Sequence, residues 1–154
     1  MGCAILTVSD TRTPETDASG ALVRRLLQAD GHRVVAYAIL PDEPQQIRRH
    51  VAGLLDDASV DAVIVNGGTG LAPRDTTFEA IVGLLEKRLD GFGELFRMLS
   101  FAEIGAAAML SRAVAGVAKD TVVVAMPGST AAVELAMKRL VLPELGHLVG
   151  LVRG

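Results

Sequence analysis

The sequence contains little of several features that other protein classes need. There is one cysteine, Cys3, so no internal disulfide can form, which suits a reducing compartment. No apolar run approaches about 18 residues, and we therefore expect no membrane span and no secretory leader, which makes a cytoplasmic protein the expectation. The formal net charge of −3 argues against a nucleic-acid-binding surface.

Patterns typical of metal clusters and of nucleophilic enzymes are also missing. The histidines His32, His50 and His147 are far apart and share no ligand spacing, so no metal cluster is expected. No G-x-S-x-G element or Cys/His arrangement occurs, which argues against nucleophilic catalysis. Aromatic residues make up only 3% of the chain, and the abundant Val, Ile, Leu and Ala are typical of parallel sheets flanked by helices.

The order of apolar segments predicts one α/β domain over residues 1–154. Strand-like runs alternate with amphipathic helical segments, which favours a parallel sheet covered on both faces. The last two strand-like runs flank a short turn at Lys119-Asp120 and predict an antiparallel pair. We therefore expect a three-layer α/β/α fold whose sheet is mostly parallel with one antiparallel strand. The expected strands are 3–8, 33–40, 61–66, 112–117 and 121–126.

Small residues and prolines predict several local boundaries. Ser19 is the expected N-cap of the first helix. Gly91-Phe92-Gly93 is expected to break the chain before one or two further helices, which an interruption near Gly105 would divide. Pro143 is expected to mark a turn before the last helix.

The most informative stretch runs from Asp61 to Ile81. A short β-branched strand leads into Gly67-Gly68-Thr69-Gly70, a backbone that can turn sharply and bring bare N–H groups close to a ligand. Arg74 and Asp75 follow, and a helix start comes after them. Strand, glycine loop, charged pair and helix start together predict an anion site that suits phosphate.

Two common phosphate loops do not fit this stretch. A P-loop requires Gly-Lys-Ser/Thr, and no lysine occurs between Gly67 and Asp75. A dinucleotide fingerprint requires a third glycine three residues after the second. Counting from Gly70, that position holds Pro73, which has no N–H to donate. The loop therefore belongs to another class of phosphate site.

Several short motifs follow one another along nearly the whole chain, and their order resembles that of a known family. The blocks are Val8-Ser9-Asp10, Asp17-x-Ser19-Gly20, Pro41-Asp42-Glu43, Gly67-Gly68-Thr69-Gly70 with Pro73-Arg74-Asp75, Gly91 to Arg97, Leu110-Ser111-Arg112-Ala113 and Met126-Pro127-Gly128-Ser129. Together they resemble the MoaB/Mog family of molybdenum cofactor biosynthesis proteins, whose fold also occurs as the G domain of plant and animal molybdopterin-binding proteins. One departure is Phe78, where the family often has proline.

The resemblance implies an activity and a set of site residues. It implies adenylyl transfer from Mg-ATP to the terminal phosphate of molybdopterin, which gives adenylylated molybdopterin and pyrophosphate. Asp42 and Asp75 are the implied catalytic residues and Mg²⁺ ligands, since Mg²⁺ prefers carboxylates and phosphate oxygens. The residues implied in binding phosphate, nucleotide or pterin are Ser9, Asp10, Gly67, Gly68, Thr69, Gly70, Arg74, Pro127, Gly128 and Ser129.

Structural roles compete with these functional ones. Asp42 stands as a possible N-cap with Gln45 three residues on, and Thr76 with Glu79 has the spacing of a capping box whose helix would run to about residue 87. Asp75 could form an Asx turn or pair with its neighbour in sequence, Arg74, and Ser129 could be a plain helix cap. For the glycine loop, three glycines within four residues exceed what one turn requires, which favours a ligand.

Other functions remain open on the sequence. The chain could be a non-catalytic molybdopterin-binding paralogue or an assembly subunit, although the presence of both Asp42 and Asp75 favours the enzyme. A different nucleotidyl transfer to another phosphorylated acceptor is a third possibility. The resemblance and an apolar-rich region from Phe92 to Leu110 predict a homo-oligomer, a trimer with a hexamer as the alternative.

Overall fold

The computed structural model describes all residues from Met1 to Gly154 and confirms the predicted mostly parallel sheet. The strands are β1 (Gly2–Val8), β2 (Arg33–Leu40), β3 (Ala62–Asn66), β4 (Lys87–Arg88), β5 (Val114–Ala118) and β6 (Thr121–Met126). They form one six-stranded sheet in the order β2-β1-β3-β6-β5-β4. Neighbours among β2, β1, β3 and β6 pair in parallel, and β5 pairs antiparallel with both β6 and β4. The single reversed strand is therefore β5.

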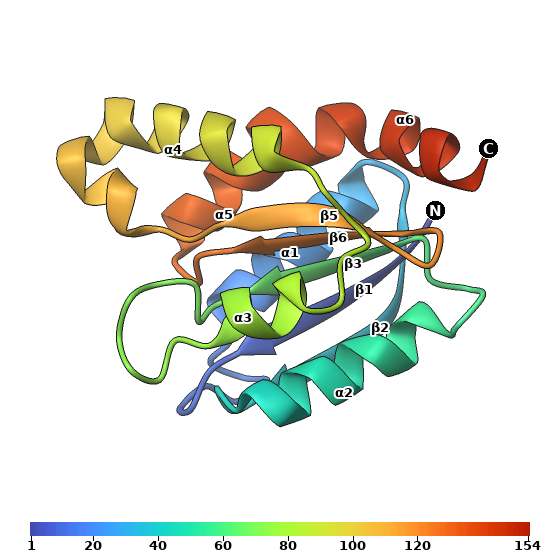
Figure 1. Ribbon diagram of the computed structural model, residues 1–154, viewed down its shortest axis with the longest axis horizontal. Helices are drawn as coiled ribbons and strands as arrows, with labels where there is room; N and C mark the ends of the chain where they lie inside the picture. The colour runs from blue at the N-terminus through green and yellow to red at the C-terminus, as the bar shows by residue number, and fades with distance from the viewer.

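Helices cover both faces of the sheet, as the three-layer prediction requires (Figure 1). The helices are α1 (Ala18–Ala29), α2 (Pro44–Leu55), α3 (Thr77–Val82), α4 (Asp90–Ile104), α5 (Thr130–Ala136) and α6 (Leu142–Arg153), with a 3₁₀ helix η1 (Gly105–Leu110) and a π-helical turn η2 (Met137–Val141). Residues of α1, α4, α5 and α6 pack with Ile5 and Ile64 in one apolar core. Residues of α2 and α3 pack with Leu6 and Val65 in the other. Strand alternation divides neighbouring residues between the two cores.

Two expected breaks in the chain are wrong. Gly91-Phe92-Gly93 lies inside the first turn of α4. A side chain at Gly93 would come within 2.7 Å of the Ala113 carbonyl oxygen, so this glycine permits close packing of α4 rather than a break. Pro143 does not mark a turn either, because it occupies the start of α6, where a missing N–H is tolerated, directly after η2.

Several smaller expectations are confirmed. The turn between β5 and β6 is formed by Lys119 and Asp120, both at positive φ (46° and 63°). Cys3 is fully buried, and burial raises the pKa of its thiol to about 11, as expected of a small core residue. None of the helices combines the length and the apolar character needed to cross a membrane.

The two-residue strand β4 was not predicted from the sequence, because two residues are too few to show a period.

Candidate functional site

The loops after β1, β2, β3 and β6 share one edge of the sheet, because these parallel strands all end there. Side chains connect these loops across large sequence separations. Arg74, after β3, contacts Asp10 after β1, and Thr76 contacts Asp42 after β2. Arg12, after β1, donates to the Gly128 carbonyl after β6. The residues predicted from four separate motifs are thus brought to one place.

The glycine loop, Gly67–Gly70, has the geometry of a close backbone approach. Gly67 and Gly68 have φ values of +100° and +69°, a region that favours glycine. A Cβ on Gly67 would lie 2.2 Å from the Val8 carbonyl oxygen, so no other residue fits there. The Gly67 N–H donates to the Met126 carbonyl (2.9 Å), whereas the N–H groups of Gly68, Thr69 and Gly70 donate to no protein acceptor. Three consecutive backbone donors are therefore available to an anion.

Asp42 is almost completely buried and joins the β2 and β3 loops. Its Oδ1 accepts hydrogen bonds from the Thr76 N–H (3.0 Å) and the Thr76 hydroxyl (2.6 Å). The N-cap position of α2 is held by Glu43, without a side-chain bond, so the N-cap alternative for Asp42 is wrong. The Asp42 Oδ2 atom accepts no protein hydrogen bond and lies against Gly68, where an added Cβ would be 2.5 Å away.

The capping box predicted for the start of α3 is also wrong. The Thr76 hydroxyl is directed to Asp42, and Glu79 pairs with Arg112 instead of returning to the helix start. The helix itself ends at Val82, well short of residue 87. Because this helix is short, an anion at this place would depend on the free N–H groups of the glycine loop.

Asp75 packs against the same loop at a second glycine, Gly70. Its Oδ2 accepts from the Ala72 N–H (3.0 Å), three residues earlier in the chain. The predicted Asx turn is therefore wrong, because that turn requires a bond to an N–H two residues later. An added Cβ on Gly70 would lie 2.7 Å from this Oδ2 atom, so the carboxylates of Asp42 and Asp75 flank the loop at Gly68 and Gly70. The Asp75 Oδ1 atom accepts no protein hydrogen bond.

The donor set fits a bound Mg²⁺ that the protein does not enclose alone. Both flanking side chains offer carboxylate oxygens, which are ligands that Mg²⁺ prefers. No group of three or more His, Cys, Asp or Glu residues is arranged to hold a metal ion. A magnesium ion at Asp42 and Asp75 would therefore complete its coordination with phosphate oxygens and water, as is usual for this ion.

Arg74 does not pair with its neighbour Asp75. Its guanidinium contacts Asp10 through two nitrogens (2.9 and 3.2 Å) and Glu43 through a third (2.8 Å). The hydrogen bonds from Arg74, followed by one from the Asp42 N–H, lower the pKa of the Asp10 carboxyl. The same carboxylates raise the pKa of Arg74. The three side chains form an exposed ion-pair cluster that links three loops.

Arg112 is a site residue whose role the sequence did not predict. Its side chain donates to the carbonyl oxygens of Gly70 and Asp75 (2.9 Å each) and pairs with Glu79, and its own N–H donates to the Thr69 carbonyl (2.8 Å). The bond from Arg112 lowers the pKa of Glu79. Arg112 therefore holds both ends of the segment that carries Asp75. Its place in a family motif was a signal, but partners some 40 residues away leave no local pattern.

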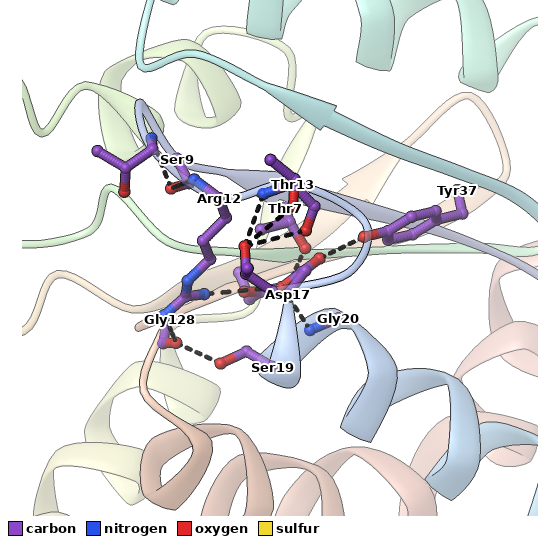
Figure 2. Close-up of polar contacts among 12 residues, drawn as sticks. Thr7, Ser9, Arg12, Thr13, Asp17, Ser19, Gly20, Tyr37 and Gly128 are labelled. Carbon is purple, nitrogen blue, oxygen red and sulfur yellow. Dashed lines mark hydrogen bonds and ion pairs between the residues drawn. The ribbon is translucent and has the colours of Figure 1, made fainter.

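The β6 loop is organised around Gly128 and Ser129. The Ser129 hydroxyl accepts from the Ala132 N–H (3.1 Å), which confirms the predicted helix cap. The Gly128 carbonyl accepts from Arg12 (2.9 Å) and from the Ser19 hydroxyl, as Figure 2 shows. Ser19 is therefore not the N-cap of α1. That position belongs to the buried Asp17, which the sequence indicated only as part of the block Asp17-x-Ser19-Gly20.

Two hollows lie at this end of the sheet, and the first is lined in part by the glycine loop. One of about 250 Å³ is largely apolar and is lined by Thr69, Gly70, Phe96, Ser100, Leu110, Ser111, Pro127 and Ser129, among others. The second, of about 500 Å³, opens on the β1 and β2 side and is lined by Ser9, Asp10, Arg12, Thr13, Tyr37 and Pro41, among others. Ser9 shapes the second hollow, since its hydroxyl accepts from the Thr11 and Arg12 N–H groups (3.2 and 3.0 Å). The predicted binding residues Ser9 and Asp10 line the second hollow, and Thr69, Gly70, Pro127 and Ser129 line the first.

Comparisons with known proteins agree with this arrangement. Residues 4–147 match the family described as "Probable molybdopterin binding domain". The chain is 55% identical over 148 residues to molybdenum cofactor biosynthesis protein B of Halalkalibacterium halodurans, covering 96% of this chain and 87% of that protein. It is 53% identical over 152 residues to the protein of the same name from Bacillus subtilis, covering 98% and 89%.

A solved structure shares both the fold and much of the sequence. The crystal structure of a molybdenum cofactor biosynthesis protein B superposes with a TM-score of 0.96 at 50% identity, covering 99% of this chain and 95% of that one. The glycine loop, its flanking carboxylates and the order of the motifs thus occur in a chain that matches one family over residues 4–147. The protein belongs to the MoaB/Mog family of molybdopterin-binding domain proteins.

Proposed function

We propose that this protein acts in molybdenum cofactor biosynthesis by transferring an adenylyl group from Mg-ATP to the terminal phosphate of molybdopterin. The relatives carry that pathway in their names, and the family is described by molybdopterin binding. The observation that carries the proposal is the glycine loop, where three free backbone N–H groups lie between two carboxylates. This arrangement suits a reaction between two phosphate-bearing substrates and a hard cation.

The reaction needs alignment and charge neutralisation more than a protein nucleophile. A terminal phosphate oxygen of molybdopterin attacks the α-phosphorus of ATP, the new P–O bond forms, and the bond to the β-phosphate oxygen breaks. Pyrophosphate leaves with that electron pair. Groups held in line react faster because the entropy of orientation is lost on binding, before the chemical step. Fixed donors aimed at the developing charge lower the barrier further.

The residues divide into three roles. The N–H groups of Gly68, Thr69 and Gly70 bind phosphate oxygens, which their freedom from protein acceptors permits. Asp42 and Asp75 hold Mg²⁺, which when bound neutralises phosphate charge and assists departure of pyrophosphate. Arg112 holds the segment from Gly70 to Asp75 in position.

The smaller hollow suits the pterin. Its walls combine apolar groups with the hydroxyls of Ser100, Ser111 and Ser129, a mixture typical of sites that bind a flat polar heterocycle. It adjoins Gly70 and Ser129, so a phosphate carried by the pterin would reach the glycine loop.

The competing function is molybdopterin binding without turnover. Incubating the protein with molybdopterin and Mg-ATP tests this directly, with pyrophosphate and the adenylylated product as readouts. The proposed transferase releases both in equal amounts, and omission of Mg²⁺ abolishes the release. Tight molybdopterin binding without pyrophosphate release would favour the binding module and contradict the transferase.

We also propose that the protein forms a homotrimer, with a hexamer as the alternative. An apolar stripe on α4 is exposed at intervals of three residues, and it consists of Leu95, Met98, Phe101 and Ile104. Met109 and Leu110 of η1 extend it. Continuous exposed apolar surface of this kind usually marks a contact. Light scattering at micromolar concentration should return a trimer or hexamer mass, and a monomer mass would contradict the proposal.

A further inference from the structure

The carboxyl-terminal edge of the sheet carries four arginines: Arg12, Arg74, Arg97 and Arg112. Arg97 donates to the Ser111 and Ala113 carbonyl oxygens on the α4 side, and Arg74 and Arg112 are neutralised at contact distance. Arg74 has Asp10 and Glu43 within 2.9 Å. Arg112 pairs with Glu79 and donates two further hydrogen bonds to the carbonyl oxygens of Gly70 and Asp75. Either side chain would have to give up existing bonds before it could bind a phosphate group.

Arg12 differs from both. One Nη atom donates to the Gly128 carbonyl (2.9 Å), and the other forms an ion pair with Asp17 at 3.7 Å, which is longer than a hydrogen bond. That carboxylate already accepts from the Tyr37 hydroxyl (2.5 Å) and the Gly20 N–H (2.9 Å), as Figure 2 shows. Arg12 therefore keeps most of its five donors free.

The Arg12 guanidinium lies beside the glycine loop. A Cβ added to Gly128 would be 3.5 Å from an Arg12 Nη atom and 3.2 Å from the Cα of Gly67. The side chain is 32% exposed and faces the larger hollow, so a ligand can reach it. Arg12 thus places a guanidinium with no carboxylate at hydrogen-bond distance beside the loop that carries the free N–H groups.

The surroundings of Arg12 hold it in place before any ligand arrives. The Ser9 hydroxyl accepts a hydrogen bond from the backbone N–H of Arg12, which fixes the loop between the two residues. Asp17 is buried, and it is held in place as the N-cap of α1 and by its hydrogen bond from Tyr37. Burial and this hydrogen bond raise the pKa of Tyr37. A cation positioned in this way loses little conformational entropy on binding.

We propose that Arg12 binds a substrate phosphate group together with the glycine-loop N–H groups, whereas Arg74 serves to join the loops. The proposal rests on the proposed function, because it assigns a residue within that site. A guanidinium suits the task, since its planar fork can donate two parallel bonds to phosphate oxygens. The ligand chemistry is a phosphate ester or polyphosphate, which either ATP or molybdopterin could supply.

Calorimetry on the full-length chain tests the assignment with Mg-ATP and molybdopterin titrated separately. Arg12→Gln should raise Kd about 10- to 100-fold for the ligand whose phosphate Arg12 holds, and Arg12→Lys should recover part of the loss because it keeps the charge. Arg88→Gln is the matched control, because Arg88 is an exposed arginine of edge strand β4 that pairs with Asp90. Arg74→Gln should weaken binding less than Arg12→Gln.

Salt dependence separates ligand binding from a merely structural role. If Arg12 contacts phosphate, log Kd of the wild type depends on log salt more steeply than that of Arg12→Gln, because a charge contact is lost. If Arg12 only supports the Gly128 carbonyl, the two slopes agree and the variant loses thermal stability instead. Equal slopes, equal affinities, a larger loss in Arg74→Gln, or no binding of either ligand by the wild type would each overturn the proposal.

The outcome is independent of whether the enzyme turns over. Wild-type protein that binds phosphate ligands through Arg12 and releases no pyrophosphate would refute the transferase and retain this assignment. Normal pyrophosphate release together with unchanged affinity in Arg12→Gln would refute this assignment and retain the transferase.

Discussion

The two ends of the parallel strands differ in how they use their backbone donors. At the amino-terminal end, the N–H groups of Gly2, Ser59 and Lys119 donate to Asp61, Asp57 and Glu86 at 2.7–2.8 Å. At the carboxyl-terminal end, the N–H groups of the glycine loop have no protein acceptor. Both ends are hollowed, with a space of about 440 Å³ near β4 at the amino-terminal end. Volume alone therefore does not distinguish a site. Single N–H groups without a protein acceptor also occur at the amino-terminal end, such as those of Ala58 and Asp120, but only the glycine loop places three in a row between two carboxylates.

Charge is also placed differently at the two ends. At the amino-terminal end, Asp61 accepts from Gly2 and pairs with Arg153 at 2.8 Å, so one carboxylate joins β1, β3 and α6. At the carboxyl-terminal end, Asp42 and Asp75 each keep one oxygen without a donor. The first arrangement uses its charges to stabilise the fold, and the second leaves charge available for a ligand.

The largest effect is expected at Gly68. Gly68→Val places a β-branched side chain at φ +69°, with its Cβ 2.3 Å from the Thr77 hydroxyl and 2.5 Å from Asp42. We expect loss of measurable ligand binding and destabilisation by about 1–3 kcal/mol. The matched control is Gly31→Val, because Gly31 has φ +85° and nothing within 4 Å of an added Cβ. Calorimetry and melting should show a stability loss in both variants and a binding loss only at Gly68. Equal binding in both would contradict the loop assignment.

Asp75→Asn should separate catalysis from folding. The amide oxygen can still accept from the Ala72 N–H, so the melting temperature should barely change. Loss of one charged partner of the metal should lower turnover about a hundredfold, or about 3 kcal/mol. Molybdopterin affinity should survive. Pyrophosphate release and melting are measured on one preparation, and full turnover in the variant would end the catalytic role of Asp75.

Arg112 allows a smaller, paired test of loop positioning. Arg112→Gln removes the donors to the Gly70 and Asp75 carbonyls and should lower kcat about tenfold through misplacement of Asp75. Glu79→Gln removes only the exposed charge partner, so its kcat should stay within about twofold of the wild type. Steady-state kinetics distinguish them. Equal kcat values in the two variants would show that the carbonyl bonds do not position the loop.

The smallest effect on activity is expected from the opposite end. Asp61→Asn weakens the contacts to Gly2 and Arg153 and should cost about 1 kcal/mol, which lowers the melting temperature by about 2–4 °C. Turnover and ligand affinity should be unchanged, because no residue of the glycine loop contacts Asp61. Calorimetric melting and pyrophosphate release check both statements. A large fall in turnover without a fall in stability would break the comparison between the two ends.

The fold could be predicted from the sequence largely because its strands are apolar runs with clear limits. The expected strands 33–40 and 121–126 match β2 and β6 to the residue. Errors arose where one residue type serves two purposes. A glycine such as Gly93 is typical of a chain break, but here it permits close packing of α4. Thr76 stands three residues before Glu79, as in a capping box, but its hydroxyl donates to Asp42. Local spacing cannot distinguish these uses, because the deciding partner is remote in sequence.

The candidate site was predictable in its glycine loop and carboxylates, and less so in its cations. Gly67 and Gly68 lie at the positive φ values that the motif indicates. Arg74 was the expected phosphate partner, and its pairing with Asp10 and Glu43 becomes visible only when the β1, β2 and β3 loops are brought together. The roles of Arg12 and Arg112 depend on carbonyl acceptors after other strands, which no local pattern encodes.

Amide hydrogen exchange tests the difference between the two ends most directly. Exchange is followed in the free protein and after addition of Mg-ATP, of molybdopterin, and of both. We predict that the amides of Gly68, Thr69 and Gly70, which have no protein acceptor, become protected on ligand addition. Amides at the amino-terminal end, such as those of Gly2 and Lys119, should exchange at unchanged rates. Protection at the amino-terminal end with none in the glycine loop would contradict the account.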